Sequence, residues 1–415
     1  MNPFFGILSL LIAILWATIP DSSILAADIW VSTTGNNSNS GASVDTALAS
    51  AEVAAGKVRP GDRIVFADGT YGQLTFAELK GTEAQPIVIA AANPGQATVT
   101  VNRLDQGIGI TLKKCEYVTL DGFHISKLMK GIDVVSSHHC KVLNNVIEQL
   151  GQEAIHVGRM HTYDGTHQFL GPASEHVDVI GNTITGTGKL NPQYGEGIYI
   201  GTGAFRGDDT HDILIENNTL TDISAEGVEL KPGTSRVVVR GNRISNTHHE
   251  YNGAITVSVE GVEDIDGQFT IENNRIWNIK QVKHGVAGIA IGHGNTIIRN
   301  NLIWNIEGGI GIRVYQTFRN ANALRVQIDH NTVIAGTPGA SLLLHDGTAG
   351  GEASPLKAHV RTSNNLTDDG SAGSVRATPV QLKGPFTDDA NAGQGPGSGF
   401  RPKRTIRDGV DWKKL

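Results

Sequence analysis

Glutamate recurs at one position of a repeated segment, and the last copy of that segment also carries a lysine. The segment follows a turn of small residues and alternates apolar with other residues: EAIHV from Glu153, EGIYI from Glu196 and EGVELK from Glu226. Such alternation, bounded by Gly and Asn, predicts short β-strands. Carboxylates stacked at strand spacing repel one another, and a hard divalent cation would relieve that repulsion. Calcium fits best, because it accepts carboxylate oxygens in loose geometry, whereas zinc prefers His or Cys ligands.

Lys231 lies five residues after Glu226 and two residues after Glu229, on the outward side of the same predicted strand. Low exposure and a nearby cation both favour a neutral amine, which can act as a general base. Glu229 is a further candidate ligand for the cation. The plainer alternatives are a salt bridge from Lys231 to Glu229 or Glu226, and a solvated acidic edge in place of the cation site.

The elements that position these residues belong to a repeat of a few tens of residues, which is typical of stacked architectures. A strand rich in Val and Ile, ending in Asn and a further aliphatic residue, recurs at spacings of 24 to 37 residues. The aligned asparagines are Asn145, Asn182, Asn218, Asn242, Asn274, Asn301, Asn331 and Asn365. We therefore predict an all-β, single-stranded, right-handed parallel β-helix. Its asparagines would take the left-handed conformation at one corner and hydrogen-bond to the next coil.

The chain divides into four predicted segments that form one domain. Residues 1–27 are expected to be a signal peptide, 28–104 an N-terminal cap with the first coils, 105–384 the parallel β-helix, and 385–415 an irregular C-terminal tail packed on the helix. The uncharged apolar run from Phe4 to Ile19 predicts a secreted or periplasmic protein, with an uncleaved anchor as the alternative. A short helix is expected from about Ala47 to Ala55.

Charge and cysteine content narrow the functional classes. The formal charge is -7 and no basic field is present, so nucleic acid is not an expected partner. After removal of the signal peptide we expect no membrane partner, and we expect a monomer. Cys115 and Cys140 fall on neighbouring coils, where either a disulfide or two buried thiols would be compatible with the spacing.

Stacking of coils converts the repeat into a predicted surface, in which equivalent positions form outward columns. One predicted column contains Asp133, His156, Tyr199, Glu229, Thr256, Ala290 and Gly311. The next contains Gly158, Gly201, Lys231, Ser258, Gly292 and Arg313. Long inserted loops on both sides of the glutamates supply further candidates for sugar binding or proton donation, namely His161, Tyr163, His167, Arg206, His248, His249 and Tyr251.

Two stretches of the chain resemble the parallel β-helix polysaccharide lyases of family six, which include chondroitinase B and alginate lyases. VRPGDRIVFADGTYG, GTEAQPIVIAAANPG and YVTLDGFHIS resemble the opening of that family. EGVELK resembles its spacing of an acidic calcium ligand and a lysine base, and family nine pectate lyases have a similar arrangement. The resemblance implies that calcium, held by Glu226 and its neighbour, binds a uronate carboxylate. It also implies that Lys231 removes the C5 proton before β-elimination.

One part of the family pattern is missing. The next coil has Val257-Ser258-Val259 where the family has Arg-His-Gly, although His293-Gly294-Asn295 occurs one coil later. Candidate proton donors are therefore His156, Tyr199 and His293, and candidate substrate-binding residues are Arg206, His161, His249 and Arg313.

The resulting hypothesis is a secreted, calcium-dependent lyase that acts on an anionic, uronate-containing polysaccharide. One alternative is a β-helix glycoside hydrolase, in which the catalytic carboxylates would come from Glu153, Glu196, Glu226 and Glu229. The others are a C5-epimerase and a non-catalytic carbohydrate-binding surface protein.

Overall fold

The computed structural model of the chain describes residues 26–162, 168–203, 208–248, 252–258, 267–280, 286–307, 309–316, 324–335, 340–346, 359–369 and 375–376. The predicted signal peptide lies outside these residues except for its last two positions, and the predicted tail, 385–415, lies wholly outside them. Within the described part of the chain, no helix combines the length and the apolar character that crossing a membrane requires.

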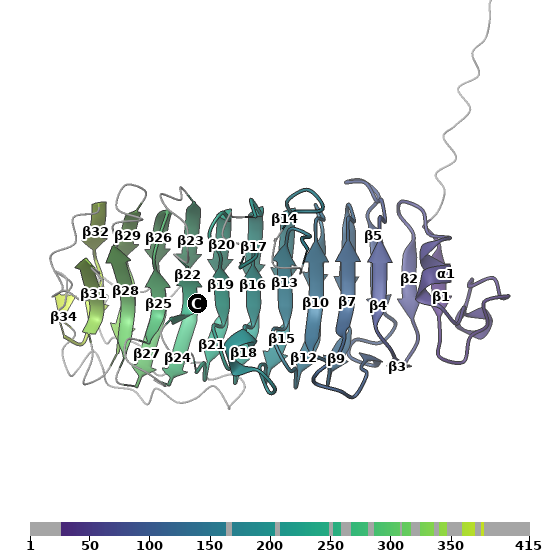
Figure 1. Cartoon of the computed structure of the whole chain (residues 1–415), viewed down its shortest axis with the longest axis horizontal. Coiled ribbons are helices and arrows are strands. Elements are labelled where there is room, and N and C mark those ends of the chain that lie inside the picture. Colours follow the sequence, from purple (N-terminus) through teal and green to yellow (C-terminus); the bar gives the residue numbers. More distant parts are fainter. Residues whose placement is uncertain are drawn as a thin grey trace, which may run out of the picture.

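Parallel strands form three sheets that run the length of the molecule (Figure 1). Sheet 1 contains β1 (Asp28–Val31), β2 (Arg63–Phe66), β5 (Ile87–Ala91), β8 (Val118–Asp121), β11 (Lys141–Leu143), β14 (Glu175–Ile180), β17 (His211–Glu216), β20 (Ser235–Arg240), β23 (Gln268–Glu272), β26 (Asn295–Arg299), β29 (Arg325–Asp329) and β32 (His359–Ser363). Sheet 2 contains β3 (Gly69–Tyr71), β6 (Ala97–Val99), β9 (His124–Ser126), β12 (Val146–Glu148), β15 (Thr183–Thr185), β18 (Thr219–Thr221), β21 (Arg243–Ser245), β24 (Arg275–Ile279), β27 (Leu302–Ile306), β30 (Thr332–Ile334), β33 (Leu366–Thr367) and β34 (Val375–Arg376). Sheet 3 contains β4 (Leu74–Ala77), β7 (Ile108–Lys113), β10 (Lys130–Val135), β13 (Ile155–Gly158), β16 (Ile198–Ile200), β19 (Val228–Leu230), β22 (Gly253–Val257), β25 (Ala287–Ile291), β28 (Ile310–Gln316) and β31 (Ala340–Asp346).

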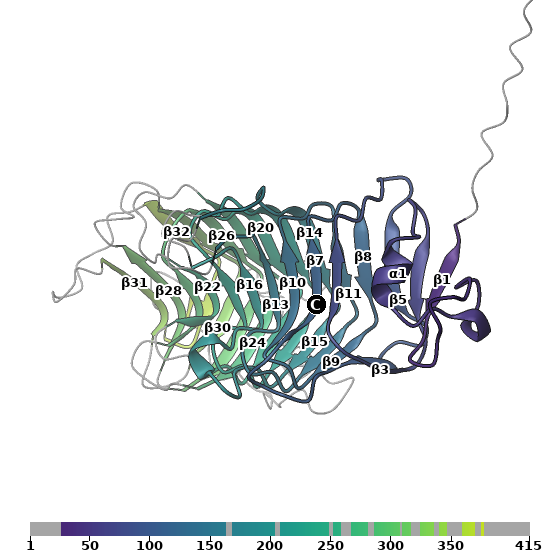
Figure 2. The same cartoon turned by 45° about the vertical axis from the view of Figure 1, so that its right-hand side comes forward.

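Each coil visits sheet 3, then sheet 1, then sheet 2, and the next coil repeats that order one strand further along (Figure 2). Inward residues of successive strands stack directly on one another. In sheet 3, the buried Ile132, Ile155, Ile198, Val228 and Ile255 are aligned by strand register. Removal of these aliphatic side chains from water supplies the main driving force for stacking. The predicted right-handed parallel β-helix is confirmed.

A ladder of asparagines occupies the corner between sheets 1 and 2. Each ladder asparagine is fully buried, and from Asn145 to Asn331 the Nδ2 of each donates to Oδ1 of the next at 2.9 or 3.0 Å. The main-chain N–H of each donates to the same oxygen. The ladder was predicted, but the expectation that its asparagines are left-handed was wrong. The residue before each one has the positive φ, as at Asn144, Gly181, Asn217 and Gly241, because the bend must come before the side chain turns inward.

The N-terminal end of the solenoid is closed by extended chain and a short helix. The predicted helix is shorter than expected and forms α1 (Ala51–Ala55), which packs against β1, β2 and β4. Leu48, which was expected to lie in the helix, forms a parallel bridge with Val31 of β1. This bridge keeps the chain just before α1 extended. A 3-10 helix η1 (Val44–Thr46) lies before it, and a second, η2 (Pro192–Tyr194), lies between β15 and β16.

Cys115 and Cys140 are two buried free thiols, which decides between the two options left open by the sequence. The Cys140 sulfur lies 3.4 Å from the His138 carbonyl oxygen and 3.7 Å from that of Cys115. Burial raises the pKa of the Cys140 thiol to about 12, so this thiol stays protonated and unreactive at neutral pH.

Candidate active site

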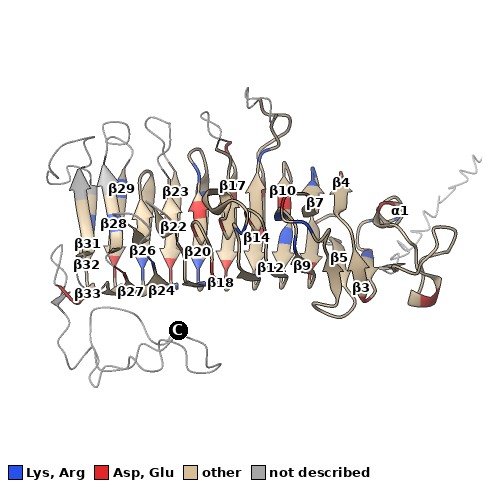
Figure 3. Cartoon of the chain, turned by 60° about the horizontal axis from the view of Figure 1, so that its bottom comes forward, with Lys and Arg blue, Asp and Glu red and all other residues tan. Residues whose placement is uncertain are grey.

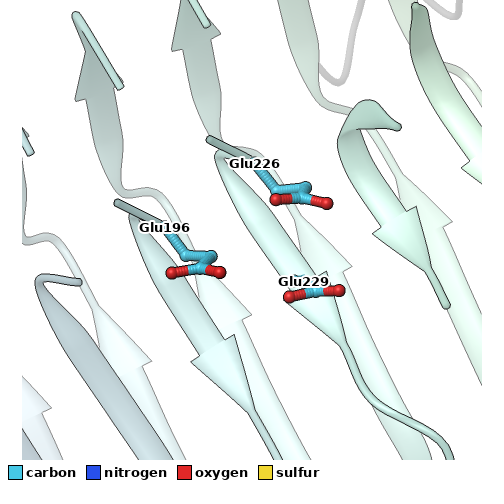
Figure 4. A group of neighbouring side chains, drawn as sticks. All are labelled: Glu196, Glu226 and Glu229. Atoms are coloured by element: carbon cyan, nitrogen blue, oxygen red, sulfur yellow. The ribbon is translucent and has the colours of Figure 1, made fainter. Parts of the chain in front are cut away.

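Three glutamates converge near the beginnings of two neighbouring strands of sheet 3. Glu196 and Glu226 occupy equivalent bends before β16 and β19, and Glu229 projects from β19 itself (Figure 4). Each has a carboxylate oxygen within 4.8 Å of the others, and all three residues are buried. We refer to these three residues as the glutamate cluster.

Glu153 does not join the glutamate cluster, although its backbone is in register with Glu196 as the repeat predicts. Its carboxylate lies 2.5 Å from the Lys130 amine on the preceding coil. Lys130 occupies the position equivalent to Glu153 on that coil. It neutralises Glu153, and Glu229 takes the third place in the cluster.

The glutamate cluster concentrates negative charge in a site with little access to water. Burial, followed by the charges of Glu229 and Glu226, raises the pKa of Glu196 well above the usual range of a carboxyl. Asn252, just before β22, donates its amide to Glu226 at 2.5 Å. Glu196 therefore either retains a proton or, when it is ionised as a cation ligand, needs a compensating positive charge.

Lys231 lies at the edge of the glutamate cluster with its amine 2.8 Å from the Glu229 carboxylate. Only 6 % of the residue is exposed. The amine also lies 5.3 Å from the centre of the Tyr199 ring. Gly201 precedes it in the column, and a Cβ there would come within 3.0 Å of the Lys231 Cβ. The glycine thus makes room for the lysine on the neighbouring coil.

His156 is held by partners on both sides of its ring. Its Nδ1 lies 3.3 Å from the Asp133 carboxylate, and its Nε2 lies 3.0 Å from the Gly201 carbonyl oxygen, to which a protonated Nε2 donates. Burial alone would lower the pKa of His156, but the Asp133 carboxylate outweighs burial and raises it. Because both nitrogens face acceptors, His156 is suited to positioning Gly201 rather than to releasing a proton to a substrate.

His293 is fully buried and packs edge-on against Phe269, with ring centroids 5.3 Å apart. Burial lowers the pKa of His293 to about 4, and the nearby Ser258 backbone offsets this only in part. Neither ring nitrogen has a hydrogen-bond partner of good geometry among the described residues. Among the described residues, His293 is thus a neutral, enclosed imidazole, which makes it a poor candidate for a proton donor to a polysaccharide.

The remaining candidates are scattered around the site. His161 is half-buried beside the loop after β13, with its Nδ1 2.9 Å from the Thr162 carbonyl oxygen. Arg313 pairs with Ala290, so it belongs to the column of Glu229 and not, as predicted, to that of Lys231; Gly311 lies two residues earlier. The sequence-based alignment was two residues out on this last coil. Arg206 and His249 lie outside the described residues, as do Tyr163, His167 and Tyr251.

Two contacts of the candidate site were missed by the sequence-based reasoning. Asn252 was not singled out, because it lies one residue before the predicted strand and outside the column of glutamates. Asp133 was placed in the correct column beside His156, but the ion pair between them was not anticipated. Charge complementarity between adjacent members of a column could have indicated that pair.

Comparison with known proteins adds to this geometry. Residues 47–168 match the family model described as chondroitinase B, and residues 169–366 match the model described as right handed beta helix region. The resemblance to the parallel β-helix polysaccharide lyases is confirmed. No match is found among the curated proteins.

Solved structures of two lyases and of a lacto-N-biosidase share the fold of this chain. An alginate lyase from Paenibacillus sp. str. FPU-7 is 17% identical, with a TM-score of 0.53, over 75% of this chain and 94% of that one. Pectate lyase Pel9A is 16% identical, with a TM-score of 0.51, over 93% and 90% of the two chains. A GH136 lacto-N-biosidase from Eubacterium ramulus is 15% identical, with a TM-score of 0.54, over 82% and 67%. At these identities the likeness extends to the fold.

Proposed function

We propose that this protein is a secreted, monomeric polysaccharide lyase that cleaves a uronate-containing polymer by calcium-assisted β-elimination, with Lys231 as the base. The observation that carries the proposal is the contact between the Lys231 amine and a buried group of three carboxylates, at 2.8 Å from Glu229. Perturbed, buried titratable groups that touch one another are a mark of catalytic sites.

The glutamate cluster fits a calcium ion by the chemistry of its donors. Its ligands would be carboxylate oxygens of Glu196, Glu226 and Glu229, which calcium prefers and which lie close enough together to share one ion. Burial, followed by repulsion from Glu229 and Glu226, raises the pKa of Glu196, and the charge of such an ion would oppose that shift. When bound, calcium would neutralise the carboxylate of the uronate and thereby acidify its C5 proton.

The protein residues supply the proton transfers. The neutral Lys231 amine would take the C5 proton; the electrons of the C5–H bond form the C4–C5 double bond, and the C4–O bond breaks towards the leaving sugar. Glu229 holds the amine in place at 2.8 Å. The leaving oxygen then needs a proton, and the Tyr199 hydroxyl is the best-placed donor of the three candidates. Tyr199 is half-buried beside Lys231, whereas His156 is committed to two acceptors and His293 is enclosed.

A hydrolase is the second candidate, because the raised pKa of Glu196 would also suit a general acid. Such an enzyme would use a second carboxylate of the cluster as its nucleophile or base. A C5-epimerase would share the proton abstraction but return a proton to C5 and leave the chain intact. Only the lyase creates an unsaturated sugar end, which absorbs in the near ultraviolet.

The test is the ultraviolet absorbance of alginate, polygalacturonate, dermatan sulfate and hyaluronan during incubation with the mature protein, with calcium or with a chelator. We expect a calcium-dependent rise with one polymer and a loss of about 100-fold or more in Lys231→Ala. Lys141→Ala, which removes an exposed lysine of sheet 1, is the matched control and should retain full activity. New reducing ends without absorbance would identify a hydrolase, and absence of both would remove the catalytic proposal.

Secretion is tested separately by the N-terminus of the exported protein. Cleavage after Ala27 would give a mature chain that begins at Asp28, the first residue of β1. Intact-mass measurement of protein recovered from the medium or periplasm distinguishes this from retention of the apolar segment.

A further inference from the structure

A groove of about 780 Å³ lies on the outer face of sheet 1, away from the glutamate cluster. It crosses the strands from β17 to β32, which are separated by five inter-strand spacings, or about 24 Å. Its exposed lining includes Arg236, Gln268, Ile297, Gln327 and Arg361. We call this surface the arginine groove.

Two arginines of the groove differ from the other lysines and arginines on the strands of sheet 1. Arg325 and Arg361 make no ion pair with a carboxylate among the described residues, and the Arg325 guanidinium donates to the Leu324 carbonyl oxygen. The other lysines and arginines of these strands each face a carboxylate, in the pairs Arg63–Asp28, Lys141–Asp178, Arg236–Asp212, Arg240–Glu216 and Arg299–Glu272. The groove therefore has a local excess of positive charge on a chain of net negative charge.

The two arginines lie on adjacent strands and face the same side. Arg325 pairs with His359 and Gln327 pairs with Arg361, so the arginines are diagonal neighbours across β29 and β32. Guanidinium groups bind carboxylates through two parallel N–H donors. Gln268 and Gln327 add amide donors and acceptors, and Ile297, 38% exposed, adds an apolar surface. Carboxylate, hydroxyl and C–H groups are what an acidic polysaccharide presents.

We propose that the arginine groove is a second binding site for the anionic polysaccharide, in which Arg325 and Arg361 hold uronate carboxylates. This inference rests on the proposed substrate class. The chain's own C-terminal segment is a poorer occupant, because residues 377–415 contain seven Lys or Arg and four Asp residues and would be repelled. Residues 232–234 join Lys231 to the strand β20, which lines the near end of the groove.

The experiment measures binding in the absence of turnover, by affinity electrophoresis of full-length Lys231→Ala in gels containing alginate, polygalacturonate or dermatan sulfate. We expect Arg325→Gln/Arg361→Gln in that background to weaken binding of the retained polymer about tenfold, and added salt to reduce the difference. Arg63→Gln/Lys141→Gln removes the same charge from paired positions of the same sheet and should change binding little. Equal retardation of the two double variants by every polymer, with unchanged melting temperatures, overturns the proposal.

The outcome is separable from that of the catalytic proposal. Loss of polymer binding in the groove variant, without ultraviolet absorbance from the parent protein, supports a binding surface and rejects the lyase. Unchanged binding in a protein that produces unsaturated ends supports the lyase and rejects the groove.

Discussion

Two regions of the molecule stack charged side chains coil upon coil, and they do so in opposite ways. On the outer face of sheet 1, register aligns Glu216, Arg240, Glu272, Arg299 and Asp329, which alternate in sign from strand to strand (Figure 3). We call this column the charge ladder. At the bends before β13, β16 and β19 of sheet 3, the three aligned residues are all acidic, from Glu153 to Glu226. Glu229 adds a further carboxylate from β19.

The difference teaches how a repeat separates stability from function. In the charge ladder, side chains on neighbouring strands neutralise each other's charge. The Arg240 Nε lies 2.7 Å from the Glu216 carboxylate, and the Arg299 Nε lies 2.6 Å from the Glu272 carboxylate. In the glutamate cluster, like charges meet in a buried place, which costs stability in the free protein. A fold retains such an arrangement where a ligand or a reaction supplies the missing charge.

The largest expected effect follows from the same substitution made in both regions. Glu226→Gln removes one carboxylate of the glutamate cluster, and we expect activity to fall by about 100-fold or more, since a ligand and a charge are both lost. Glu272→Gln removes one carboxylate of the charge ladder and should leave activity within about twofold. Initial rates of absorbance increase at saturating polymer measure both. Equal losses would contradict the distinction between the regions.

The asparagine ladder sharpens the comparison, because it shows how much stability a buried stack of hydrogen-bonded side chains contributes when none of them is charged. Asn242→Ala deprives Asn218 of its acceptor and removes donors to the Ile215 and Arg240 carbonyl oxygens. We expect a loss of about 2–4 kcal/mol in the free energy of unfolding, since several buried groups become unsatisfied. Urea unfolding measures it. Asn93→Ala, at an exposed amide bonded to Asp68, is the control and should cost less than about 1 kcal/mol.

Relief of the like charges should be visible in the pH dependence of stability. Because the pKa of Glu196 is raised in the folded protein, the folded state binds more protons than the unfolded state above about pH 4.5, and stability falls as pH rises through this window. Glu196→Gln should therefore raise the melting temperature of calcium-free protein at pH 7 by a few degrees and have little effect at pH 4. Calcium should raise the melting temperature of the parent and much less that of the variant. A lower melting temperature for Glu196→Gln at pH 7 would show that the carboxylate is already compensated.

The smallest effect is expected in the charge ladder. Arg240 is 42% exposed in its side chain, and its ion pair with Glu216 is screened by water. Arg240→Gln should cost less than about 1 kcal/mol, and the cost should shrink further at 1 M salt. Denaturant unfolding at two ionic strengths measures this. A cost above 2 kcal/mol, independent of salt, would mean that the charge ladder holds the coils together.

The fold could be predicted from the sequence because each coil of a solenoid repeats the same sequence pattern. The eight asparagines and the alternating apolar segments recur often enough to define the coil length and the inward face, and the strand register agrees with them from Asp133 to Ala290. Alignment failed at Arg313, where Gly308 to Gly311 allow two placements of the same short pattern.

The candidate site was predictable only in part, because side chains choose partners that a column does not specify. Glu153 turned to Lys130 and left the glutamate cluster, although its backbone is in register. Asn252 reached Glu226 from outside the repeat. The burial of His293, and hence its lowered pKa, depends on the Phe269 ring on an adjacent segment, which no local pattern reveals.

The asparagine ladder also has a consequence for the length of the molecule. Each rung makes the same bonds to the rung before and the rung after, so the ladder carries no information about how many coils precede it. A whole coil could be duplicated or deleted between Asn301 and Asn331, and the asparagines brought together would bond as their predecessors did. Duplication of a coil within the gene thus leaves the hydrogen bonds of the ladder intact and shifts only the coils that follow the new one. The number of coils can therefore set the distance between the glutamate cluster and the far end of the solenoid without changing the bonds that hold the coils together.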